Sequence, residues 1–148
     1  MAGFKGQAEY SVDQKGRVAI PAKMRNALNP EAKNTFTVTR GFEQCIFAYP
    51  LDRWERMEAE MEELNIYRSQ TRNFIRSVLM YAEEVTLDAQ GRVGVPKRLL
   101  QFAGIAGDAL IIGALDHIEI WNPESFHDFQ AEKMEDYETL AEKVMGSE

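Results

Sequence analysis

Short stretches in which apolar and polar residues alternate predict the β-strands of this chain. "EYSVD" (9–13) and "EEVTLD" (83–88) alternate as half-buried strands do, and each is followed, after a turn, by a short apolar strand, "RVAI" (17–20) or "RVGV" (92–95). Further along each half, paired apolar stretches predict one β-hairpin: residues 35–41 with 45–50, and residues 109–114 with 117–123.

Helical periodicity lies between and after these strands. A proline opens each of the stretches 21–28 and 96–103, and because proline suits the first turn of a helix, both are predicted to be short helices. Apolar residues three and four positions apart predict two more helices between residues 51 and 80. The same spacing predicts one longer helix over 123–148.

These elements occur twice because the sequence repeats. At an offset of 75 residues, "DQKGRVAIP" (13–21) matches "DAQGRVGVP" (88–96), and at an offset of 72 the later hairpin matches as well. The change of offset places three extra residues in the first copy, around "NALNPEAKN" (26–34). We therefore divide the chain into a first unit, connecting helices, a second unit and an acidic C-terminal helix: residues 5–50, 51–80, 81–122 and 123–148.

Each unit is too small to close a hydrophobic core alone. The other unit is the nearest partner. The sequence therefore predicts an α+β fold in which two β-α-β units interleave around a pseudo-twofold axis into one β-barrel-like body, with the helices outside it.

The repeated string specifies a tight turn. Asp13 and Asp88 can accept hydrogen bonds from backbone N–H groups further along the turn, and Gly16 and Gly91 permit the positive φ that returns the chain antiparallel. Each turn therefore presents an arginine, Arg17 or Arg92, just past its tip.

Positive charge is concentrated in and after these turns, although the formal net charge of the chain is -7. The candidate DNA-binding residues are Lys15, Arg17, Lys23, Arg25, Arg92, Lys97 and Arg98. Such a cluster suits phosphate contacts, and an arginine at a rigid hairpin tip can reach guanine edges in a major groove. In the plainer interpretation each aspartate–arginine pair only fastens its turn, but a surface ion pair contributes only ~0 to 1 kcal/mol. We favour the DNA-binding interpretation.

Negative charge is concentrated at the other end of the chain. From Glu124 to Glu148 there are eight acidic residues and two lysines. Two interpretations stay open: a solvated helix packed on the body, or a subunit contact or autoinhibitory acidic arm.

The two strings "DQKGRVAIPAKMR" and "DAQGRVGVPKRLL", with "FTVTRG", "CIFAYPLDRWE" and "IIGALDHIEIW", resemble the MraZ family. The family motif D-x-x-x-R matches Asp13 with Arg17 and Asp88 with Arg92. The resemblance covers about residues 3–130 and implies two SpoVT-AbrB-type swapped-hairpin units. It also implies a transcriptional regulator of the division and cell-wall gene cluster that includes its own gene. Such a regulator would bind short direct repeats in double-stranded promoter DNA as a ring-shaped homo-oligomer, such as an octamer.

Two other classes of function are weaker alternatives. For an enzyme, His117 and His127 have no partner at metal or triad spacing, and Cys45 is predicted to be a buried strand residue, so we expect no catalytic residue, metal or cofactor. Tyr49, Trp54 and Trp121 are predicted to pack in the core or at a subunit interface. An antitoxin-like protein-interaction module on the same fold ranks second, because the C-terminal segment has helical periodicity and not the character of an extended tail.

The composition also restricts the compartment. A single cysteine suits a reducing cytosol, and the sequence has no apolar stretch long enough for a signal sequence or a membrane span. We expect a cytoplasmic, nucleoid-associated protein with no membrane partner.

Overall fold

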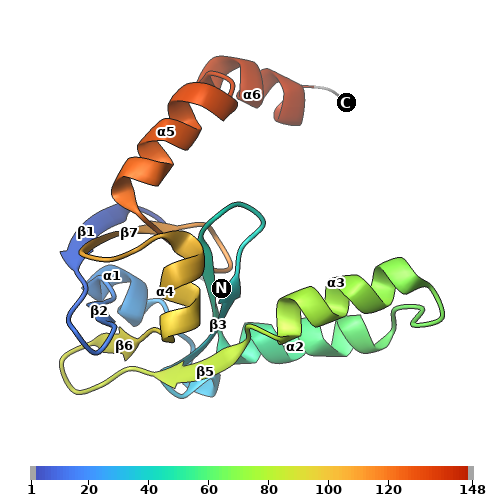
Figure 1. Cartoon of the computed structure of the whole chain (residues 1–148), viewed down its shortest axis with the longest axis horizontal. Helices are drawn as coiled ribbons and strands as arrows, with labels where there is room; N and C mark the ends of the chain where they lie inside the picture. Colours follow the sequence, from blue (N-terminus) through green and yellow to red (C-terminus); the bar gives the residue numbers. More distant parts are fainter. Residues whose placement is uncertain (1–2, 147–148) are drawn as a thin grey trace.

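The structure, a computed structural model, describes residues 3–146 as a mixed body of strands and helices from which two helical arms project (Figure 1). The strands are β1 (Gln7–Ser11), β2 (Arg17–Ala19), β3 (Thr35–Arg40), β4 (Ile46–Pro50), β5 (Glu83–Thr86), β6 (Arg92–Gly94), β7 (Asp108–Gly113) and β8 (Ile118–Trp121). The helices are α1 (Ala22–Asn26), η1 (Pro30–Ala32), α2 (Leu51–Glu62), α3 (Ser69–Leu79), α4 (Lys97–Ala103), α5 (Pro123–Lys133) and α6 (Tyr137–Met145). The predicted α+β class is confirmed.

Strands from the two halves of the chain are interleaved in one antiparallel sheet. Its order is β1-β7-β8-β4-β3-β5, so β1 pairs with a strand of the second half and β5 with a strand of the first. If every strand is replaced by its counterpart in the other half, the order reads the same from the opposite edge. This symmetry is the arrangement expected of two interleaved copies.

The remaining strands, β2 and β6, form a separate antiparallel ladder of two. Val18 lies opposite Val93 at its centre, with Arg17 opposite Gly94 and Ala19 opposite Arg92. Because the two strands are equivalent in the repeat, the ladder brings the two aspartate–arginine turns together.

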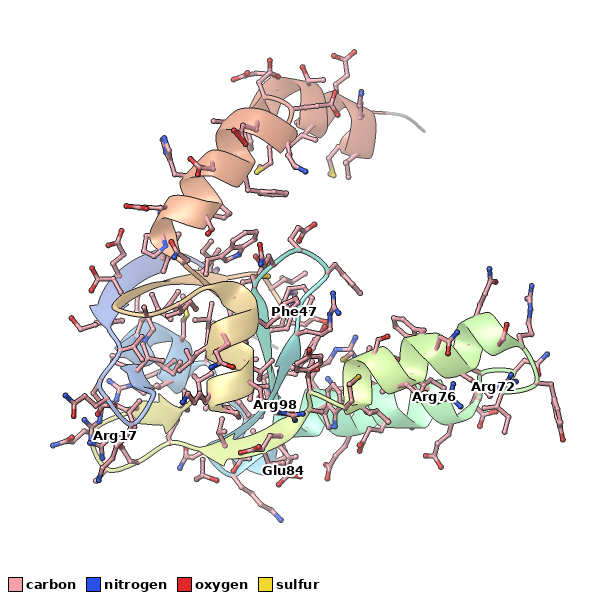
Figure 2. The ribbon with its side chains drawn as sticks, in the orientation of Figure 1. Arg17, Phe47, Arg72, Arg76, Glu84 and Arg98 are labelled. Atoms are coloured by element: carbon pink, nitrogen blue, oxygen red, sulfur yellow. The ribbon has the colours of Figure 1, made fainter. Side chains whose placement is uncertain are left out.

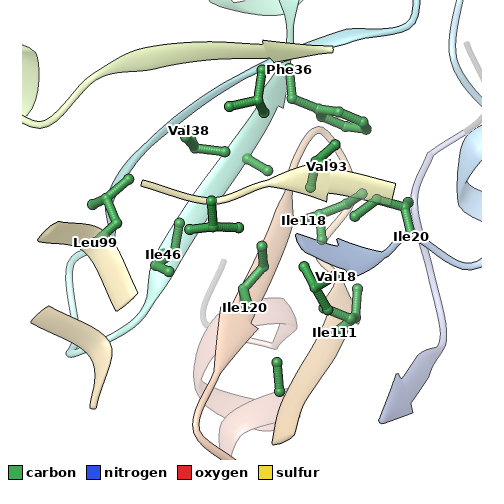
Figure 3. Close-up of a cluster of buried hydrophobic side chains, with 14 of the residues drawn as sticks. Val18, Ile20, Phe36, Val38, Ile46, Val93, Leu99, Ile111, Ile118 and Ile120 are labelled. Carbon is green, nitrogen blue, oxygen red and sulfur yellow. The ribbon is translucent and has the colours of Figure 1, made fainter. Parts of the chain in front are cut away.

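The main core lies between one face of the sheet and this ladder (Figure 3). Alternate residues of the central strands point into it, including Phe36, Val38, Ile46, Ile118 and Ile120, all fully buried. Val18 and Val93 cover them from the ladder, and Leu99 of α4 joins the same cluster. The ladder strands β2 and β6 therefore pack against a close-packed, rigid layer of β-branched and aromatic side chains.

A second apolar cluster covers the opposite face of the sheet. It contains Tyr49, Trp54 and Trp121, all buried, together with Cys45 and Phe47. The three aromatic residues, predicted to pack in the core or at a subunit interface, are buried in the core. Cys45 is fully buried as expected, and burial raises the pKa of its thiol.

The helices after each unit are arms that leave the body. α2 and α3 run side by side away from the sheet, and α5 and α6 leave it in another direction (Figure 1). Trp54 is the only buried residue within α2, and α3, α5 and α6 contain none among the residues described.

The expectation of one long C-terminal helix is wrong, because the structure has two. Met134 adopts an extended conformation after α5, and the side chain of Asp136 accepts a hydrogen bond from the backbone N–H of Thr139, which caps a new helix. Glu148, which the predicted helix included, lies outside the described residues.

The insertion predicted around residues 26–34 contains the short helix η1 and two residues with positive φ, Lys33 and Asn34. Asn29 beside it donates a hydrogen bond to Asp52 of α2 (Nδ2 to Oδ2, 3.0 Å). The extra residues thus connect the first unit to its arm. None of the helices within residues 3–146 combines the length and apolar composition needed to cross a membrane.

Candidate nucleic-acid interface

The first turn is held almost entirely by Asp13. Its Oδ1 accepts hydrogen bonds from the backbone N–H groups of Lys15 and Arg17, both at 2.9 Å, and its Oδ2 accepts one from Nε of Arg17 at 2.7 Å. Gly16 has φ +82° and donates its N–H to the carbonyl of Asp13. The aspartate thus fixes both the turn and the direction of the arginine.

The second turn repeats this geometry bond for bond. Oδ1 of Asp88 accepts from the backbone N–H groups of Gln90 and Arg92 at 2.9 Å, and Oδ2 accepts from Nε of Arg92 at 3.0 Å. Gly91 has φ +77°. Asp13, Gly16, Asp88 and Gly91, the four residues assigned to the turns in the sequence, make these contacts or adopt positive φ.

The two turns also hold each other. The backbone N–H of Val95 donates to the carbonyl of Gly16, and the N–H of Ile20 donates to the carbonyl of Gly91. Nη1 of Arg92 lies 3.7 Å from Oδ2 of Asp13, the same oxygen that Nε of Arg17 contacts. Both guanidinium groups therefore lie on one face of the molecule.

This pair of arginines stays open to solvent. The side chain of Arg17 is 38% exposed and that of Arg92 is 28% exposed. Among the described residues, the hydrogen bonds of both side chains use only Nε, so their terminal nitrogens can donate to an incoming acceptor. An arginine oriented by a carboxylate and free at its planar end suits contacts with phosphates and base edges.

The two aspartates remain ionised at neutral pH. The backbone N–H of Arg17 is the largest influence lowering the pKa of Asp13, and the backbone N–H of Arg92 has the same effect on the pKa of Asp88. Each carboxylate offsets part of the positive charge while it orients the arginine.

The other predicted basic residues are distributed less uniformly. Lys15, Lys23 and Lys97 are exposed, in the first turn, in α1 and at the start of α4 respectively. Arg25 is half-buried, and its guanidinium packs directly over Gly91. Arg25 therefore supports the second turn.

Arg98 lies apart from the paired arginines. Its Nη2 donates to the carbonyl of Met80 at 2.9 Å, and its guanidinium lies 5.4 Å from the ring centre of Tyr81. Figure 2 shows Arg98 beside α4 and β5, well separated from Arg17. These contacts attach α4 to the end of the first arm.

A polar cluster that the sequence did not predict lies on the opposite face of the sheet. Nδ1 of His117 is 2.8 Å from Oδ1 of Asp116, and its Nε2 is 3.6 Å from Oε2 of Glu119. Arg53 of α2 completes the cluster through Oδ2 of Asp116 at 2.9 Å. The only signal in the sequence was the adjacent Asp116 and His117, because Arg53 is 63 residues away from Asp116.

This cluster connects the first arm to the second unit. Burial lowers the pKa of His117, but hydrogen bonds and charge from Glu119 and Asp116 outweigh burial and raise it overall. The imidazole lies against the ring of Phe47, with 4.4 Å between ring centres. Within residues 3–146, no group of three or more metal-ligating side chains is placed to hold an ion.

Comparison with protein families confirms that the chain contains two copies of one unit. The family model described as "MraZ protein, putative antitoxin-like" matches the chain twice, over residues 4–77 and 78–146. The chain belongs to the MraZ family. Each match contains one aspartate–arginine turn, so the two MraZ units meet at the β2–β6 ladder. Each MraZ match also includes the helices that follow the strands, which joins each arm to the unit before it.

Proposed function

We propose that this protein is a sequence-specific DNA-binding transcriptional regulator of the division and cell-wall gene cluster, including its own promoter. The observation that carries the proposal is the pair of guanidinium groups, Arg17 and Arg92, that share one face and one carboxylate oxygen. Family membership supports it. The exchange of β1 and β5 between halves supports the finer assignment to the swapped-hairpin, SpoVT-AbrB type.

In this proposal the two turns enter a groove of the DNA together. Arg17 and Arg92 read base edges, while Lys15, Lys23 and Lys97 contact phosphates and set the position of the protein. Asp13 and Asp88 hold the arginines in one direction before binding, so little side-chain freedom is lost on contact.

One subunit offers few contacts and binds weakly. A homo-oligomeric ring would place identical basic faces side by side, so that successive direct repeats in a promoter are bound at raised effective concentration. The form that regulates transcription is therefore a ring bound to double-stranded DNA. It acts in the cytoplasm and is associated with the nucleoid.

The test begins with selection of genomic DNA by the purified protein at two salt concentrations, which supplies the probe. Arg17→Ala is expected to abolish specific binding in a titration, and Arg92→Ala to weaken it by roughly 10- to 100-fold. Lys15→Ala is expected to weaken all sequences alike and to reduce the salt dependence by about one ion. Arg56→Ala, on the exposed surface of α2, is the matched control. Wild-type affinity in folded Arg17→Ala protein would reject the proposal.

An antitoxin-like interaction module is the second candidate, favoured by the acidic residues of α5 and α6 and by the wording of the family description. Copurification of a small basic partner, with no selection of any DNA sequence, would favour it over regulation.

A further inference from the structure

The outer surface of α3 has the features of a protein contact. Arg68, Arg72 and Arg76 follow one another at intervals of four residues, so they form a row along one side of the helix, and Figure 2 shows Arg72 and Arg76 along the arm. No acidic residue occurs between positions 64 and 82. Ile75 and Leu79 lie one turn from Arg72 and Arg76, and Leu79 is 41% exposed. The row therefore borders a groove in which these apolar side chains lie beside Glu58 and Glu62 of α2.

None of these arginines has a carboxylate partner within the described part of the chain. Arg72 donates to the carbonyl of Ile66 at 2.9 Å, and Arg76 donates to Oδ1 of Asn73 at 3.0 Å. Both contacts are neutral, exposed and local. The charge of the row is therefore available to a partner.

The second arm offers the complementary surface. A groove along α5 is lined by the aromatic side chains of Trp121 and Phe129 and by the charged side chains of Glu43, Asp128, Glu132 and Lys133. Glu124, Asp128 and Glu132 also repeat every four residues, so they form an acidic row. Each row spans nine residues, and the eight rises between its ends make about 12 Å of helix. The two rows match in length, spacing and opposite charge.

One chain cannot bring these surfaces together. The two arms leave the body in different directions, so α3 and α5 of one chain point away from each other (Figure 1). A contact between α3 of one copy and α5 of another joins two different surfaces. Each copy can therefore contact one neighbour through α3 and a second neighbour through α5. A contact of this head-to-tail type forms a closed ring when its rotation closes.

We propose that α3 of one copy docks along the α5 groove of a second copy, its arginine row paired with the acidic row and its apolar side chains over Trp121 and Phe129. The inference rests on the proposed ring and gives its contact. It assigns the acidic arm, for which the sequence left two interpretations open, to assembly.

Two charge-reversed proteins test the contact without DNA. One carries Arg72→Glu with Arg76→Glu, and the other carries Asp128→Lys with Glu132→Lys. Each alone is expected to lose the assembly and give subunit-sized particles in light scattering and native mass spectrometry. When they are mixed in equal amounts, every α3–α5 contact between unlike subunits again joins opposite charges, so assemblies of alternating composition are expected to return.

Lys5→Glu with Lys33→Glu changes the net charge as much as the arginine pair does and lies on neither helix, so it is the matched control. Retention of the wild-type mass by both reversed proteins overturns the inference, as does failure of the folded pair to reassemble on mixing. If the arginine variant keeps its mass but loses DNA, the row contacts DNA and the inference is wrong. Reassembly by a protein that selects no DNA would instead reject the proposed function and leave the contact standing.

Discussion

The two aspartate–arginine turns share their internal hydrogen bonds and differ in what holds them from outside. Over Gly91 lies the guanidinium of Arg25, whereas the equivalent neighbour of Gly16 is Leu100. Among the described residues, the carboxylate of Asp13 contacts both arginines, whereas the carboxylate of Asp88 contacts one of them, Arg92. The repeated string thus encodes the shape of a turn, and residues outside it make the turns unequal.

The largest expected difference lies at the two glycines. Both have positive φ, but a Cβ at Gly16 would lie 2.7 Å from the backbone oxygen of Val95, which cannot move without breaking the ladder. A Cβ at Gly91 would overlap the end of the Arg25 side chain, which can swing away. We expect Gly16→Ala to lower the free energy of unfolding by about 3 kcal/mol and Gly91→Ala by about 1 to 2 kcal/mol.

Urea denaturation followed by circular dichroism measures both values. Gly6→Ala is the control, because Gly6 has φ +87° and nothing lies within 4 Å of an added Cβ, so it reports the cost of positive φ alone. Equal losses at Gly16 and Gly91 would show that crowding does not distinguish the turns.

An intermediate loss of stability is expected on mutation of the charged cluster around His117. The second unit has charged side chains there, whereas the first unit has uncharged side chains at the equivalent positions. At an offset of 72, His117 and Glu119 correspond to Cys45 and Phe47. The pKa of His117 is raised above its unfolded value of about 6.5, so the protonated imidazole stabilises the fold below that pH, and the contribution is lost as pH rises through the folded pKa.

His117→Gln is therefore expected to lower the free energy of unfolding by about 1 to 2 kcal/mol near pH 5.5, and by less near pH 9. Urea midpoints across this range measure the change. The facing groups are Asp116 and Glu119, with Arg53 behind Asp116. A loss that is constant with pH would mean that the ring only fills space against Phe47 and Tyr49.

Features that depend on residues close together in the sequence could be predicted, whereas features that depend on distant residues mostly could not. The turn was predictable because Asp13, Gly16 and Arg17 act on one another within five residues. The side-by-side arginines followed from the repeat, since a symmetric body brings equivalent turns together. The break after α5 was missed because the apolar spacing continues through it, while a capping aspartate restarts the helix.

The roles of Arg25 and Arg98 could not be predicted in the same way. Both are basic and follow a turn, so their charge and position in the sequence placed them among the predicted DNA-binding residues. Their partners, Gly91 and Met80, are 66 and 18 residues away and are brought close only by folding. The arginine row of α3 was visible in the sequence as a spacing of four, but its meaning depends on the exposure of the arm.

The smallest expected difference separates the two aspartates. The pKa of each is lowered, chiefly by the backbone N–H of the following arginine. Each carboxylate therefore stabilises the fold above its unfolded pKa of about 3.9, and this stabilisation is lost as pH falls through the folded pKa.

Substitution of either aspartate by Asn keeps an oxygen for the backbone and removes only the charge. Because Oδ2 of Asp13 contacts two guanidinium groups, Asp13→Asn is expected to lower Tm more than Asp88→Asn at pH 7. Added salt should shrink the gap. Tm measured from pH 7 down to about pH 3 should show both losses fading, and equal losses at pH 7 would mean that Arg92 gains nothing from the carboxylate of the other turn.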